Sequence, residues 1–125
     1  MTSNLSPLAK RDETDIANSE LRDLDISIAR YVLPRLKEFR KQTDRVPDNC
    51  LTMKEWTDIL DKMIYATDRV ANGTEEDTPE YKTYVKAVWN NEQDIAYELE
   101  RAHESLRPIQ DGLDLFHKYY RNLWW

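Results

Sequence analysis

Glu100 and His103 are the residues whose types and spacing could carry chemistry. Glu-x-x-His on a helix puts a carboxylate and an imidazole one turn apart, as in the helical bundles that bind two iron ions. Such a site needs the pair twice, with two further glutamates from other helices, and the sequence has it once. The second histidine, His117, follows Asp114 rather than a glutamate at that spacing. The sequence therefore predicts no metal or other cofactor.

Arg35 and Glu92 are charged residues that fall within the apolar stripes of two predicted helices. A guanidinium left unpaired in a core is unfavourable. Arg35 is therefore expected to reach solvent or to meet a carboxylate, and Glu92 is its natural partner. Phosphate binding by Arg35 or His103 is the alternative. A nucleotide base would then stack on one of three rings, those of Trp56, Trp89 and Tyr31.

Motifs of known enzymes are missing. All-helical nucleotide pyrophosphohydrolases hold magnesium with paired acids on facing helices. Here Glu98 and Glu100 diverge on a helix, and Asp58 and Asp61 lack a clear facing pair. The sequence has no P-loop, glycine-rich dinucleotide turn or nucleophile elbow. These observations favour a protein that is not an enzyme.

The composition is that of an acidic, helix-rich chain. Of 125 residues, 34% are charged and two are glycine, and the formal net charge is −6. Few glycines argue against a turn-rich β-protein. The negative charge disfavours duplex nucleic acid, whose binding depends on Lys and Arg. No apolar run is long enough to span a membrane, and the single cysteine, Cys50, fits a reducing cytosol.

The helical period predicts an all-α fold, a three- to four-helix bundle with a flexible N-terminal arm. Residues 1–18 form the arm, since they are polar and show no period. Residues 19–125 form a single domain. The first helix is expected over about 19–43, with a kink where Pro34 removes a backbone hydrogen bond.

The second helix has the clearest start signal. Thr52 and Glu55 form a capping box, in which each side chain accepts a hydrogen bond from a backbone N–H at the helix start. The apolar period then continues to Ala71, and the pair Asn72–Gly73 is typical of a helix end. We therefore expect a helix over about 53–71.

The third helix begins at Pro79, with Thr78 as its N-cap. Its apolar period continues to residue 107, which would make a helix of roughly 43 Å, longer than the others. The element therefore either breaks at Asn90–Asn91 or projects from the bundle. A projecting aromatic end would need a partner, most simply a second copy of the chain. Its aromatic residues are Tyr81, Tyr84 and Trp89.

The C-terminal segment, residues 109–125, carries a wide apolar stripe. Pro108 and Gly112 are expected to interrupt the chain before the last helix. On a helical wheel, five residues of the stripe should close the core: Leu113, Phe116, Tyr120, Leu123 and Trp124. Trp125 points away from the stripe, which makes it a candidate for an exposed contact.

Two blocks of the sequence resemble a known family. They are LDISIARYVLPRLKEFR with LTMKEWTDILDKMIYATD, within residues 24–68, and DGLDLFHKYYRNLW, residues 111–124. The chain is similar to short, uncharacterised proteins of tailed phages that share the pattern LPRLK-x-F, EW-x-x-IL-x-KMI and GL-x-LF-x-KY-x-x-LW. No activity or catalytic residue is attached to that family. The resemblance implies origin only: a small phage protein in the cytosol of a host bacterium.

These observations favour a non-enzymatic phage accessory protein that binds and modulates a bacterial or phage protein, in host takeover or anti-defence. An acidic surface suits a partner with a basic face. A binder of a signalling nucleotide is the alternative, and a metal-dependent helical hydrolase is the second alternative. The candidate interaction or ligand residues are Arg35, Glu92, His103, Tyr81, Tyr84, Trp89 and Trp125.

Overall fold

The computed structural model describes residues 16–124. Within them the regular structure is helical and contains no strand, which confirms the all-α prediction. The elements are α2 (Asn18–Arg22), α3 (Leu24–Gln42), α4 (Met53–Ala71), α5 (Pro79–Trp89), α6 (Ile95–Ser105), α7 (Arg107–Tyr119) and the 3-10 helix η1 (Tyr120–Asn122). Most of the expected N-terminal arm, residues 1–15, and Trp125 lie outside the described residues.

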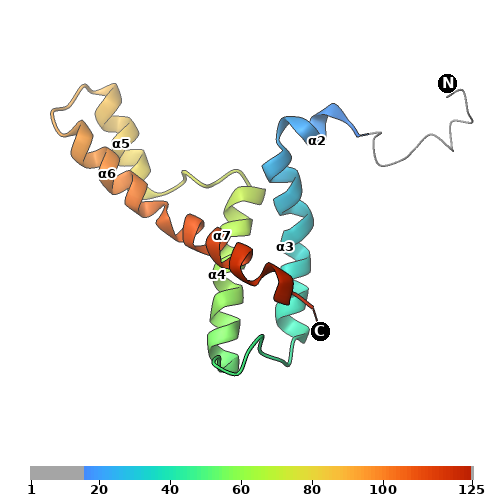
Figure 1. The fold of residues 1–125 in the computed structure, drawn as a ribbon. Coiled ribbons are helices and arrows are strands. Elements are labelled where there is room, and N and C mark those ends of the chain that lie inside the picture. The colour runs from blue at the N-terminus through green and yellow to red at the C-terminus, as the bar shows by residue number, and fades with distance from the viewer. Residues whose placement is uncertain (1–15, 125) are drawn as a thin grey trace, which may run out of the picture.

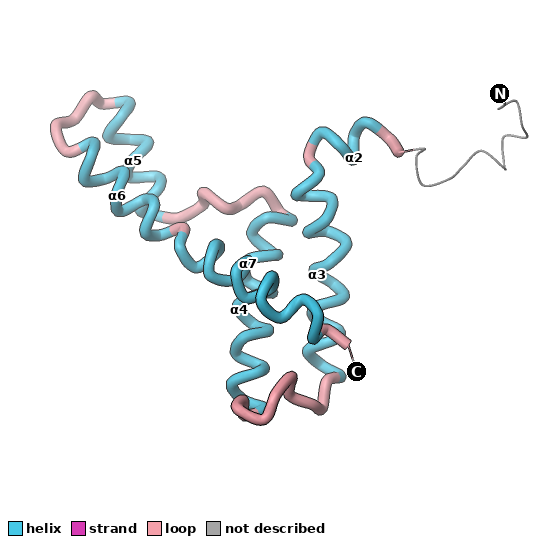
Figure 2. The backbone as a smooth tube through the Cα atoms, in the orientation of Figure 1, coloured by secondary structure: helices cyan, strands magenta, loops and turns pink. Residues whose placement is uncertain are grey.

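Helix α4 is the centre of the packed part of the protein. It contacts both α3 and α7, whereas the backbones of α3 and α7 do not come close to each other. Figure 1 shows α3 beside α4, and the hairpin of α5 and α6 extending away on the other side. Figure 2 shows α7 crossing α4 obliquely and leading to the hairpin. We call α3, α4 and α7 the three-helix group.

The larger cluster of buried side chains surrounds Trp56, Leu60 and Met63 of α4, each of which is at most 1% exposed. Leu36 of α3 completes its buried part. Tyr119 of α7 lays its ring edge-on to Trp56, with the ring centroids 5.4 Å apart. Burying each large apolar side chain contributes roughly 1.5–3 kcal/mol. This cluster therefore joins all three helices.

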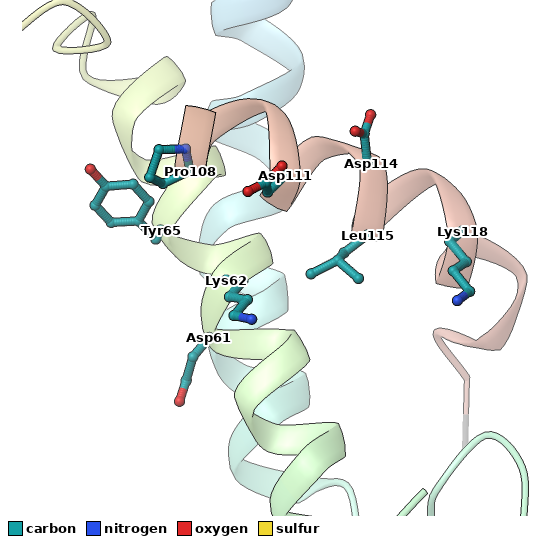
Figure 3. A pocket seen from close by; sticks show the side chains of 8 residues that line it. All are labelled: Asp61, Lys62, Tyr65, Pro108, Asp111, Asp114, Leu115 and Lys118. Carbon is teal, nitrogen blue, oxygen red and sulfur yellow. The ribbon is translucent and has the colours of Figure 1, made fainter. Parts of the chain in front are cut away.

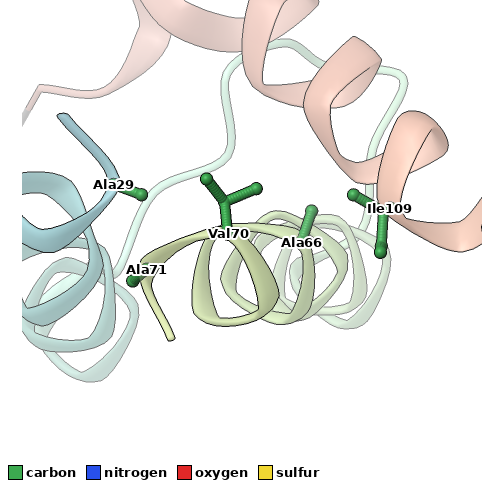
Figure 4. Close-up of a cluster of buried hydrophobic side chains, with 5 residues drawn as sticks. All are labelled: Ala29, Ala66, Val70, Ala71 and Ile109. Carbon is green, nitrogen blue, oxygen red and sulfur yellow. The ribbon is translucent and has the colours of Figure 1, made fainter. Parts of the chain in front are cut away.

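A second cluster lies nearer the C-terminal end of α4 (Figure 4). Its buried members are mostly small: Ala29, Ala66, Val70, Ala71 and Ile109. Small side chains let helix backbones approach closely, so at this end of α4 the helices pack through small side chains rather than through large rings. Three of the five members come from α4, which again makes α4 the shared surface.

Gly112 is buried where α7 crosses α4. A Cβ at this position would lie 2.6 Å from the Cβ of Ala66 and still closer to the backbone oxygen of Lys62. The prediction that Gly112 interrupts the chain is therefore wrong. The interruption expected before the last helix is found next to Pro108, because α6 ends at Ser105 and α7 begins at Arg107. Pro108 and Gly112 both lie inside α7, with Pro108 in its first turn, where the missing N–H is tolerated.

The end signals of α4 are confirmed. Thr52 Oγ1 accepts a hydrogen bond from Glu55 N at 3.1 Å, and the Glu55 carboxylate accepts one from Thr52 N at 2.9 Å. The helix ends at Ala71, and Gly73 follows with a φ of +66°. Since that left-handed conformation is strained for residues with a Cβ, glycine is suited to it.

The first predicted helix is two helices. The chain breaks at Asp23, whose φ of −126° and ψ of 58° are not helical, and α2 and α3 lie on either side. The predicted continuation through Pro34 is confirmed, because α3 extends to Gln42. No helix within residues 16–124 is both long and apolar enough to cross a membrane.

The C-terminal stripe closes the core only in part. Leu113, Tyr120 and Trp124 are 37%, 62% and 66% exposed, so the prediction that they are buried is wrong. Phe116 and Leu123 do pack against the larger cluster. Helix α7 ends at Tyr119, and beyond that residue the helical period used for the prediction no longer applies.

Replacing Gly112 with alanine should lower the free energy of unfolding by about 2 kcal/mol. A clash with backbone at a close helix contact costs about 3 kcal/mol, and the higher helix propensity of alanine offsets only about 1 kcal/mol of it. Urea denaturation followed by circular dichroism measures the change. Asp111→Ala, at an exposed position of the same helix, is the control and should shift stability by less than about 0.5 kcal/mol. A Gly112→Ala protein as stable as the wild type would contradict the close contact.

Candidate interaction site

Of the two alternatives for the third predicted helix, the break at Asn90–Asn91 is the one observed. Helix α5 ends at Trp89, Asn91 has a φ of +52°, and α6 begins at Ile95. The chain reverses there, so α5 and α6 pack against each other as a hairpin. Among the described helices outside the hairpin, only α7 contacts it, at the junction with α6.

The hairpin has a thin core. In α5 the buried residue is Ala87, and in α6 it is Ala102. Helices of 11 residues are marginal by themselves and depend on packing for their stability. Two alanines bury little apolar surface. Within residues 16–124, the hairpin therefore lacks the covering element that a helix pair of this length would ordinarily have.

Large apolar side chains of the hairpin face solvent. Trp89, the last residue of α5, is 84% exposed, and Tyr97 of α6 is 59% exposed. Val85 and Val88 extend the exposed apolar surface along α5. We call these four residues the hairpin patch. Their exposure on a projecting element makes these residues the candidate site for contact with another molecule.

Tyr81 and Tyr84 belong to the same helix as Trp89 but are half-buried. Their rings meet edge-on, with centroids 5.9 Å apart. Burial raises the pKa of the Tyr81 hydroxyl, and the neighbouring carboxylate of Glu76 raises it further. The two tyrosines are therefore partly packed in the first half of α5, whereas Trp89 exposes its ring at the turn.

The base of the hairpin is closed by hydroxyl groups. Thr78 caps α5, since its Oγ1 accepts a hydrogen bond from Tyr81 N at 3.1 Å. The same Oγ1 lies 2.8 Å from the hydroxyl of Ser105, at the end of α6, and that hydroxyl donates to the Ala102 carbonyl at 2.6 Å. These bonds tie the start of α5 to the end of α6, so they fix the hairpin at its root.

Charged contacts hold the loop that precedes α5. Arg69 of α4 donates to the Asp77 backbone oxygen at 2.6 Å. The Asp77 carboxylate pairs with Lys82 at 2.8 Å. The hydrogen bond from Lys82 and the positive charge of that residue lower the pKa of the Asp77 carboxyl. The loop is thus attached both to α4 and to α5.

Arg35 and Glu92 do not meet, so of the two alternatives expected for Arg35 the one observed is that its side chain reaches solvent. The Arg35 guanidinium lies 3.7 Å from the centre of the Tyr31 ring and donates to the Tyr31 carbonyl at 2.8 Å. Glu92 lies in the turn between α5 and α6 and accepts a 3.4 Å hydrogen bond from the Asn90 side chain. Because α3 packs against neither α5 nor α6, the two charges are on separate parts of the molecule.

His103 and Glu100 are exposed on α6. Across residues 16–124, no group of three or more His, Cys, Asp or Glu side chains is placed to hold a metal ion. His103 borders an open hollow of about 310 Å³ that Glu75 and Glu76 also line. Trp56 is buried in the core and Trp89 is at the hairpin turn, so the rings considered for stacking a base do not surround one site.

An open hollow of about 780 Å³ lies between α4 and α7 (Figure 3). Its lining mixes acids and lysines: Asp61, Lys62, Tyr65, Pro108, Asp111, Asp114, Leu115 and Lys118. Asp61 is paired with Arg40, with bonds of 2.5 and 3.1 Å, and this contact raises the pKa of the guanidinium. The hollow is an open, charged surface without a set of convergent groups.

Comparison of the chain with protein-family models, with curated protein sequences and with solved structures found no match. The candidate site is defined by the geometry of the hairpin. Of its patch, the sequence had pointed to Trp89. Val85, Val88 and Tyr97 were missed because their spacing is also that of core residues. They are exposed because no other helix in the described part of the chain covers them.

Thr78→Ala should loosen the hairpin without unfolding the three-helix group. Loss of an N-cap costs about 1 kcal/mol, so amide protection at the start of α5 and the end of α6 should fall by about fivefold. Hydrogen exchange read by NMR measures this. Thr83→Ala is the control, since its hydroxyl bonds only to the Pro79 carbonyl of the same helix. An equal loss of protection in α4 would contradict a local role.

The Asp77 carboxyl should titrate below the usual range of an aspartate, and Lys82→Gln should return its pKa to that range. A depressed pKa means that the contact is complete above the ordinary aspartate pKa and is lost as the pH falls through the lowered value. An NMR titration of the side-chain carboxyl carbon tests both statements. Lys86→Gln, one turn further along α5, is the control and should leave the titration unchanged.

Proposed function

We propose that the protein is a non-enzymatic accessory protein of phage origin, and that it binds a bacterial or phage protein in the host cytosol through the hairpin patch. The observation that carries this proposal is the 84% exposure of Trp89 at the turn of a helix pair that, among the described helices, only α7 contacts. The resemblance of two sequence blocks to short tailed-phage proteins supports the origin.

Tryptophan and tyrosine are the residues most often found at the centre of protein interfaces, where they fill pockets of the partner. In the patch, Trp89 and Tyr97 are rings of this kind, and two valines enlarge the apolar area.

The charge of the hairpin suits a basic partner. Residues 79–105 contain six acidic and three basic residues, a balance of −3 before histidine is counted. Electrostatic complementarity mainly raises the rate of association and excludes partners of like charge. Apolar contact at the patch would then supply most of the affinity, so the interaction should persist at moderate salt.

Trp89→Ser should greatly weaken partner capture while leaving the fold intact. The tagged full-length chain is used as bait in lysate of infected bacteria, and any stoichiometric protein is identified by mass spectrometry. The variant should bind the identified protein at least tenfold more weakly, because an exposed tryptophan at an interface typically contributes 2 kcal/mol or more.

Tyr65→Ser is the matched control, since Tyr65 is 43% exposed but lies in the hollow between α4 and α7. It should bind the partner as the wild type does. Equal binding by the Trp89→Ser protein would exclude the patch. Repeated baits that retain no protein would count against the interaction role itself.

A further inference from the structure

A second uncovered apolar surface lies on α3. Leu24, Ile28 and Tyr31 are 49%, 54% and 63% exposed and follow one another at spacings of four and three residues. This spacing places them in one stripe along the helix, which we call the α3 stripe. The residues with which α3 packs on the core are a different set: Ala29, Val32, Leu33, Leu36 and Phe39. The stripe is therefore free of any role in the core of the described protein.

The α3 stripe continues into an apolar groove. Because the backbones of α3 and α7 both lie close to α4 but not to each other, a hollow of about 300 Å³ remains between them. Ile28 lines it from α3, Val70 from α4, and Leu113 and Phe116 from α7. A helix lying against the stripe would cover this opening as well, which adds apolar area to the contact.

Two charged residues bracket the stripe, and neither has an ionic partner within residues 16–124. Asp25 follows Leu24 and lines the groove, and Arg35 lies one turn beyond Tyr31 with its guanidinium over that ring. Glu38, the next acid along α3, is engaged by its own neighbours at i+3 and i+4. Asp25 and Arg35 are ten residues apart, roughly 15 Å, and cannot reach each other within one helix.

We propose that the α3 stripe is a homodimer interface in which the α3 helices of two copies pack antiparallel. One register satisfies all the features above. It sets Ile28 against Tyr31 of the partner subunit and Leu24 against Arg35 of the partner subunit. Both pairs are centred on the same point of α3, between Ala29 and Arg30, so the two-fold axis that forms one pair also forms the other. The guanidinium then lies beside Asp25. Two-fold symmetry repeats each contact, so both unpaired charges of both copies become paired.

The positions of Asp25 and Arg35 along α3 favour antiparallel over parallel packing of the two copies. A parallel pair would place Asp25 beside Asp25 and Arg35 beside Arg35, and like charges in contact disfavour association. The antiparallel pair brings opposite charges together at both ends of the stripe. Figure 1 shows the hairpin and α3 on opposite sides of α4, so this dimer leaves the hairpin patch uncovered. The inference therefore does not depend on the proposed function.

Sedimentation equilibrium of the full chain over a concentration series tests the dimer. The wild type should change from monomer to dimer mass as the concentration rises. Asp25→Arg alone and Arg35→Asp alone should each weaken dimerisation at least tenfold, because each puts like charges in contact. The double variant restores the pair with the charges exchanged, so its dissociation constant should return to within about threefold of the wild type.

Lys37→Asp is the matched control for charge. Lys37 is exposed on the opposite side of α3, and the substitution changes net charge as Arg35→Asp does. It should leave dimerisation unchanged. A wild type that stays monomeric throughout the series overturns the proposal, and so does a double variant as weak as the single ones.

Crosslinking tests the interface with Asp25 and Arg35 left unchanged. Ile28→Cys in a Cys50→Ser background should give a dimer with a short bis-maleimide, because the two Ile28 positions lie close to the symmetry axis. Lys37→Cys in the same background should not. Circular dichroism confirms that each variant is folded. Equal crosslinking at both positions would overturn the proposed register.

Discussion

The close crossing of α4 and α7 at Gly112 is the constraint on which the rest of the structure depends. With no side chain at that point, the backbone of α7 rests directly on Ala66 and on the backbone at Lys62. Contact between backbones fixes where α7 lies on α4. The C-terminal end of α7 then places Tyr119 against Trp56, and its N-terminal end follows directly after α6. The direction of the hairpin is therefore set by a packing contact in the core.

Local signals in the sequence predicted the helix ends well, because a cap is decided by residues within one turn. The capping box at Thr52 and the break at Asn90–Asn91 are of this kind. Gly112 was misread because a glycine that ends a helix and a glycine that admits a neighbouring helix look the same in a sequence. Which of the two applies depends on α4, and α4 is some 45 residues away along the chain.

The candidate site was predictable only in part, since exposure depends on which helices pack together. The apolar period of Tyr81, Tyr84 and Trp89 is the same whether a helix is covered or open, and the length of the third element suggested only that it could project. Arg35 and Glu92 each fit a stripe, but their helices do not meet. The structure instead separates two uncovered surfaces, one on α3 and one on the hairpin. This separation would allow self-association and partner binding at the same time.

The hairpin also affects how easily α4 and α7 come together during folding. Residues 72–106 form the connection that must close before α4 and α7 can touch. The entropy of closing a loop grows slowly with its length, by about 0.6 kcal/mol for each doubling. A hairpin that forms early from local contacts brings its two ends together and shortens the effective loop. This connection is therefore a place where the chain can gain, lose or exchange residues in evolution with little effect on the three packed helices.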